Sequence, residues 1–89
     1  MTTVREPAVA GTFYPNDAAT LSALISTYLE GDAGLNCPKA IIAPHAGYIY
    51  SGAIAGEVYR KLESAHDKIK RVVLLGPSHR VAFKGMAVP

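Results

Sequence analysis

Two stretches decide the fold of this chain: KAIIAPHAGY at residues 39–48 and RVVLLGPSH at residues 71–79. Each begins with a run of apolar residues that favours a β-strand. A proline ends each run, and a histidine follows it by one or two residues, giving His45 and His79. We therefore interpret both stretches as strands that end in a histidine-bearing turn.

A segment of helical length separates the two predicted strands. A strand–helix–strand crossover makes its strands parallel and is nearly always right-handed. Both histidines should then emerge at the edge where open α/β sheets bind ligands, with imidazoles within about 8 Å of each other. The predicted fold class is α/β, a parallel β-α-β unit with strands at 39–43 and 71–75 and a weak third strand at 84–88.

Apolar periodicity predicts two helices. Residues 1–15 indicate an extended lead-in, with a packed loop at 11–15, and the first helix begins at Asn16 or Asp17, either of which is a good N-cap. Gly31 is its predicted C-cap. The second helix is expected from about residue 51 to 64, with Ser51 as N-cap. The predicted buried face of the first helix comprises Leu21, Leu24, Ile25, Tyr28 and Leu29. The predicted sheet-facing stripe of the second comprises Ala55, Val58, Tyr59 and Leu62, with Ile54 alongside.

Length and composition indicate a folded but incomplete unit. With 89 residues, 49% apolar and 18% charged, the chain is typical of a small, core-forming protein. A parallel sheet needs both faces covered and usually more strands than this sequence supplies. We therefore interpret residues 1–89 as a single incomplete domain that self-associates or pairs with the remainder of the domain.

Charge and hydropathy exclude several classes of partner. The net charge of +2 is unpatterned. Nucleic-acid binding would need a basic face with interleaved aromatics, and the sequence shows none, so no nucleic-acid partner is expected. No apolar run approaches the ~20 residues that cross a bilayer, and residues 1–6 lack the apolar stretch of a signal peptide. A single cysteine, Cys37, suits a reducing compartment. The expected location is cytoplasmic, without membrane contact.

The histidine pair is the candidate metal site. Either histidine alone is an ordinary loop residue, but strands about 4.8 Å apart allow two end-of-strand imidazoles to converge on one ion. Two ligands are fewer than zinc or non-haem iron sites use. No acidic residue or cysteine is an obvious third ligand, because Glu57 falls one turn into the predicted helix and Asp67 and Cys37 lie at the opposite end of the strands. His66 falls in a polar loop at the opposite end and is expected to be solvated.

Tyr48, Ser51 and Gly52 form the candidate ligand-binding start of the second helix. Free N–H groups and the helix dipole favour an anion there, and Tyr48 is a candidate hydrogen-bond donor or general acid. In the alternative interpretation, Tyr48 and Tyr50 pack and Ser51 merely caps the helix. The glycines match neither a Walker loop nor a dinucleotide fingerprint.

At these residues the sequence resembles the Memo family, whose prokaryotic members are called AmmeMemoRadiSam system protein B. The matching segments stand in family order and spacing at residues 5–15, 40–48, 50–52 and 75–79. The resemblance covers this whole chain but only the N-terminal part of a typical member, which agrees with the incomplete domain inferred above.

The resemblance implies a fold similar to class III extradiol dioxygenases, non-haem iron enzymes that cleave aromatic rings. The resemblance places His45 and His79 at the two site histidines of the family. It also implies that the third metal-proximal position of the family, a cysteine in animal members, falls beyond residue 89. Phe13 and Tyr14 match an aromatic pair that animal members are thought to use in recognising phosphotyrosine peptides.

Three functions follow as hypotheses. In the first, His45, His79 and a third ligand hold iron or copper, while Tyr48 and the Ser51–Gly52 helix start orient a small anionic or aromatic substrate for redox or dioxygenase-like chemistry. In the second, the same pocket is a non-catalytic binding module for phosphorylated or carboxylated ligands. In the third, the 89-residue piece is an inactive fragment.

Overall fold

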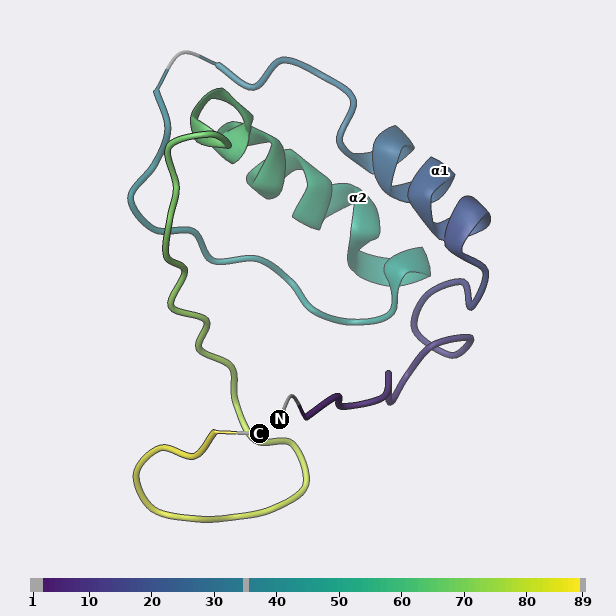
Figure 1. Cartoon of the computed structure of the whole chain (residues 1–89), viewed down its shortest axis with the longest axis vertical. Coiled ribbons are helices and arrows are strands. Elements are labelled where there is room, and N and C mark those ends of the chain that lie inside the picture. Colours follow the sequence, from purple (N-terminus) through teal and green to yellow (C-terminus); the bar gives the residue numbers. More distant parts are fainter. Residues whose placement is uncertain (1–2, 35, 89) are drawn as a thin grey trace.

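The computed structural model describes residues 3–34 and 36–88, and its regular structure is helical. Helix α1 spans Ala18–Tyr28, α2 spans Tyr48–Tyr59, and the short 3-10 helix η1, Arg60–Ala65, continues α2. Figure 1 shows α1 and α2 packed side by side, with a long segment leading from the end of α1 back to the start of α2. The C-terminal segment runs away from the helices as an open loop.

Helix α1 begins where the sequence predicts. The Asp17 carboxylate accepts a 2.8 Å hydrogen bond from the Thr20 backbone N–H and a 2.7 Å bond from the Thr20 hydroxyl, so Asp17 is the N-cap. The predicted C-cap is wrong: Leu29, whose N–H bonds the Ile25 carbonyl, ends the helix. Gly31 lies two residues further on, where its φ of 131° belongs to the following turn rather than to the cap.

Helix α2 begins three residues before the predicted start, with Gly47 and not Ser51 as N-cap. The backbone N–H of Tyr48 donates to the Phe13 carbonyl at 2.8 Å, and the N–H of Ser51 already donates to the Gly47 carbonyl at 3.1 Å. The N-terminal loop thus satisfies one of the backbone donors that the first turn of a helix leaves unpaired. The predicted single helix over 51–64 is also corrected, since the α-helix ends at Tyr59 and tightens into η1.

Two glycines allow α1 and α2 to approach each other closely. Gly52 and Gly56 are buried against Tyr28. A Cβ at Gly52 would lie 2.5 Å from the Tyr28 ring, and a Cβ at Gly56 would overlap the Tyr28 backbone carbonyl. Gly56 therefore allows α2 to lie directly against the end of α1.

The two predicted strands do not pair with each other within the described residues, so the parallel β-α-β unit stays a prediction. The β-bridge that the structure contains there is an isolated one, between Ala10 and Tyr14 in the N-terminal loop. Residues 72–75 are 78–86% exposed. No apolar side chain in the described ranges is fully buried, and the radius of gyration of 15.0 Å exceeds the about 12 Å typical of a compact domain this long.

Candidate functional site

The structure brings the two predicted site histidines together. The Nε2 atoms of His45 and His79 lie 3.2 Å apart, with ring centroids separated by 5.3 Å and ring planes inclined by 42°. Both side chains are exposed. At this distance one Nε2–H can donate to the lone pair of the other ring, or two lone pairs can face a common ion. The proximity predicted from the sequence is present, and the metal role stays a prediction.

The spacing of the two nitrogens fits a shared ion. Two imidazole nitrogens at about 2.0–2.1 Å from one metal stand roughly 3.1–3.4 Å apart when the angle at the metal is about 100–110°. The observed 3.2 Å lies in this range. Across residues 3–34 and 36–88, no group of three or more histidine, cysteine, aspartate or glutamate side chains is arranged to hold a metal. The described residues therefore offer a ligand pair rather than a full ligand set.

Near each histidine, a serine hydroxyl forms a hydrogen bond with the backbone. Next to His45, the Ser51 hydroxyl donates to the Ala46 carbonyl at 2.9 Å. Next to His79, the Ser78 hydroxyl donates to the Val81 carbonyl and accepts a 3.3 Å bond from the Val81 N–H. The first turn is also anchored by the bond from Tyr48 to the N-terminal loop, whereas every described residue of the second turn and its flanks is exposed.

A cavity of about 510 Å³ opens beside His45, between the N-terminal loop, α1 and α2. Its walls include most of the predicted site residues, namely Phe13, Tyr14, His45, Tyr48 and Gly52. Tyr28, which the sequence did not mark as a site residue, is among the other residues that line it. The cavity walls are mainly apolar and aromatic, which is the usual character of a small-molecule site.

Three tyrosines form one wall of this cavity. The Tyr48 ring lies 5.6 Å from the Tyr14 ring and 6.4 Å from the Tyr28 ring, measured between centroids. The Tyr28 hydroxyl donates to the Tyr48 carbonyl at 3.2 Å. The apolar period predicts Tyr28 on the buried face of its helix. The signal that could have marked Tyr28 as a site residue is its hydroxyl on an otherwise apolar face, since a buried hydroxyl needs a hydrogen-bond partner.

The residues at the start of α2 differ in how far they are exposed. Ser51 is 7% exposed, and its hydroxyl is used within the chain by the Ala46 carbonyl. Tyr50 is 85% exposed, so the alternative in which it packs is wrong. Tyr48, in contrast, is half-buried among aromatic neighbours.

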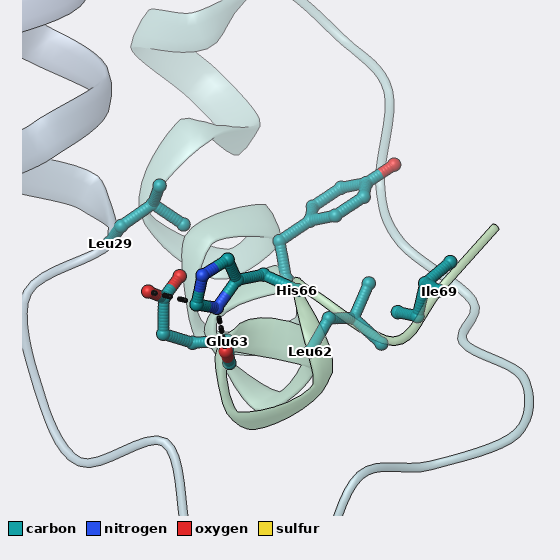
Figure 2. Close-up of a pocket in the computed structure, with 6 residues that line it drawn as sticks. Leu29, Leu62, Glu63, His66 and Ile69 are labelled. Carbon is teal, nitrogen blue, oxygen red and sulfur yellow. Dashed lines mark hydrogen bonds and ion pairs between the residues drawn. The ribbon is translucent and has the colours of Figure 1, made fainter.

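His66 lines a second pocket, of about 300 Å³, near the end of α1 (Figure 2). Its Nδ1 is 2.8 Å from the Glu63 carbonyl oxygen, which fits an Nδ1–H donating to that carbonyl, and 4.0 Å from the Glu63 carboxylate. The hydrogen bond, followed by the charges of Glu63 and Asp67, raises the pKa of His66. The side chain is 72% exposed, as expected for a solvated loop residue.

No helix within residues 3–34 and 36–88 combines the length and the apolar character that crossing a membrane requires.

Comparison with known proteins matches the chain to one family. The sequence model of the Memo-like protein family covers residues 5–89. A MEMO1 family protein of Aquifex aeolicus is 49% identical over 86 residues, which are 96% of this chain and 31% of the relative. Protein MEMO1 of Xenopus tropicalis is 38% identical over 85 residues, 94% of this chain and 28% of the relative.

A MEMO1 family protein of Thermoplasma volcanium is 38% identical over 78 residues, 86% of this chain and 28% of the relative. The chain thus spans about a third of the length of these curated relatives. No solved structure gave a significant match. From the family match and these identities, the chain belongs to the Memo-like protein family.

Proposed function

We propose that His45 and His79 are two ligands of a divalent metal site, holding iron or copper, in a Memo-family domain. The observation that carries this proposal is the 3.2 Å separation of their Nε2 atoms, which suits two nitrogens on one ion. When bound, such an ion supplies Lewis-acid or redox chemistry. A third ligand would come from outside the described residues, and the chemistry would belong to the completed domain.

The cavity beside the pair is the proposed place for a small anionic or aromatic ligand. Tyr48 is held at both backbone groups, because its N–H bonds the Phe13 carbonyl and its carbonyl accepts from the Tyr28 hydroxyl. Its ring is flanked by Tyr14 and Tyr28. A phenol fixed in this way is the group we assign to donate a hydrogen bond to an anionic substrate, while the aromatic walls exclude water from one side of it.

Metal titration of the whole 89-residue chain tests the ligand assignment. Calorimetry with Cu²⁺, or with Fe²⁺ under argon, should show weak binding by the wild type. His45→Ala and His79→Ala should each weaken it by at least about tenfold, since losing even an indirect partner of a metal ligand costs 10–100-fold. Binding should also weaken as the pH falls, because protons compete for the imidazole lone pairs.

His66→Ala is the matched control, since His66 is an exposed histidine in a separate pocket and should leave the affinity unchanged. Equal affinity in the wild type and both site variants would show that the pair is not a ligand pair. Ring cleavage or other turnover by residues 1–89 alone should be undetectable, because two ligands do not hold an ion in a defined open geometry.

A non-catalytic binding module is the second candidate, favoured by the aromatic cavity itself. In that case phenyl phosphate or benzoate should bind equally well with and without a chelator, and His79→Ala should have no effect. Phe13→Ala and Tyr14→Ala should then lower the affinity, because both residues line the cavity. Binding that requires the metal would favour the first candidate instead.

A further inference from the structure

We propose that Ser51 is a positioning residue for the histidine pair: its hydroxyl holds the Pro44–His45–Ala46 turn against the first turn of α2, so that the His45 Nε2 stays beside the His79 Nε2. The hydrogen bond from Ser51 to the Ala46 carbonyl carries this inference. The geometric claim stands on that bond alone, and only its consequence for metal affinity rests on the proposed function.

The bond differs from the usual behaviour of a helical serine. A serine inside a helix commonly donates to the carbonyl four residues back. Ser51 makes that contact, to Gly47, at 3.4 Å, but its shorter bond of 2.9 Å reaches back five residues to Ala46, outside the helix. Among the described residues, Ser51 is the one polar side chain that is buried, with 7% exposure. The hydroxyl therefore ties the helix to the residue next to His45.

The local backbone explains why one hydrogen bond matters here. The other anchor of this turn is the bond from the Tyr48 N–H to the Phe13 carbonyl, and it lies on the far side of Gly47. A glycine has the freest backbone of any residue, so an anchor beyond it does not fix the peptide before it. Tying the Ala46 carbonyl restricts that peptide, and with it the direction in which the His45 ring projects.

The His79 turn provides an internal comparison. Ser78 bonds within its own turn, to the carbonyl and N–H of Val81, and all of these residues are exposed. Water can replace an exposed hydroxyl more readily than a buried one, because the buried partner otherwise loses its hydrogen bond. Removal of the Ser51 hydroxyl should therefore disturb the pair more than removal of the Ser78 hydroxyl.

The first experiment needs no metal. In the wild type, nuclear Overhauser cross-peaks should connect the ring protons of His45 and His79. Ser51→Ala should lose or strongly weaken them, while Ser51→Thr, which keeps the hydroxyl, should retain them. Ser22→Ala, at an exposed serine of α1, is the control and should match the wild type. Far-UV circular dichroism identifies the variants that keep their helices.

Should Ser51→Ala unfold, Ser51→Cys replaces it, because the thiol fills the site but is a weak donor. Undiminished cross-peaks in a folded Ser51→Ala or Ser51→Cys variant would overturn the proposal.

The second experiment is Cu²⁺ titration of the same variants. Ser51→Ala should weaken binding by about three- to tenfold, the loss expected for one hydrogen bond, and Ser78→Ala by less. Unchanged Cu²⁺ affinity in Ser51→Ala together with a large loss in His45→Ala would overturn the positioning role while leaving the ligand assignment intact. Lost cross-peaks in Ser51→Ala with no effect of His45→Ala on Cu²⁺ binding would instead retain the positioning role and reject the metal site.

Discussion

The helical half of the chain, residues 18–65, and its C-terminal segment, residues 66–88, contrast in how they are held. In the helical half, backbone bonds, an aspartate cap and a glycine contact fix the position of each element. In the C-terminal segment every described residue is exposed, although residues 72–75 are all valine or leucine. A helix satisfies its own backbone N–H and C=O groups, whereas a strand depends on a neighbouring strand. The apolar residues predicted to form a strand here therefore stay exposed, while the helices form.

The largest expected effect concerns the exposed C-terminal segment. Val73 and Leu75 are 86% and 78% exposed, and an exposed, unpaired apolar segment promotes association. We expect the wild type to sediment as a dimer or larger species that depends on concentration, and Val73→Lys combined with Leu75→Lys to sediment as a monomer with unchanged helical circular dichroism. Ile49→Lys, at an exposed site on α2, is the control. A monomeric wild type at high concentration would contradict this expectation.

The next largest effect is a loss of stability when the contact between α1 and α2 is disturbed. Gly56→Ala gains about 1 kcal/mol of helix propensity but places a methyl group against the Tyr28 carbonyl. Overpacking of this kind costs about 1–3 kcal/mol, so we expect a net loss of up to about 2 kcal/mol in the free energy of unfolding. Urea denaturation followed at 222 nm measures it. A rise in stability would show that the helices separate without penalty.

A double-mutant cycle sharpens that result. At Gly52 the obstacle is the Tyr28 ring, while at Gly56 it is the Tyr28 backbone. Tyr28→Ala should therefore relieve the cost of Gly52→Ala but not that of Gly56→Ala, and the coupling energies should differ accordingly. Equal coupling energies in both cycles would show that Gly52 does not pack against the Tyr28 ring and Gly56 against the Tyr28 backbone.

A smaller effect concerns the start of α1. The hydrogen bonds from the Thr20 hydroxyl and then the Thr20 N–H lower the pKa of Asp17. Because the folded pKa is the lower one, this stabilisation is present above the unfolded value of about 3.9 and is lost as the pH falls through the folded pKa. Thermal melts between about pH 2 and pH 6 should show this step in the wild type. Asp17→Asn, which keeps an acceptor without the charge, should abolish it.

The smallest effect lies where the helical half ends. The pKa of His66 is raised, so its stabilisation of the helix end is complete below the unfolded value of about 6.5 and is lost as the pH rises through the folded pKa. Helicity should therefore decline slightly in that window, with the opposite sign to the Asp17 step. Glu63→Gln should reduce the decline by removing the nearby charge, and an unchanged profile in His66→Ala would refute the assignment.

Local signals made the helices predictable. Asp17 was recognisable as a cap because its side chain reaches its own helix, and the apolar period of α1 placed Tyr28 on the inner face. The start of α2 was misplaced because Tyr48 finds its partner in Phe13, a residue 35 positions earlier that no local pattern reveals. The spacing of Gly52 and Gly56 does mark one helix face, although the sequence does not say which element covers that face.

The candidate site was predictable in part. Two similar motifs suggested that His45 and His79 meet, and their rings do lie together. The parallel sheet from which their proximity was expected stays a prediction, so the agreement concerns the position of the two rings alone. Ser51 was predicted as a helix cap or ligand-binding residue because it is a serine at the expected start of a helix. Its actual partner, the Ala46 carbonyl, depends on the path of the backbone before α2, which the sequence does not reveal.

The tyrosine wall has a spectroscopic consequence. The chain has no tryptophan, so its near-ultraviolet signal comes mainly from five tyrosines, and the ring of one of them, Tyr48, lies against those of Tyr14 and Tyr28. These rings come from the N-terminal loop, α1 and α2, and near-ultraviolet circular dichroism reports fixed packing of such rings. The docking of all three elements around the cavity is therefore observable in the unlabelled protein, separately from its helix content.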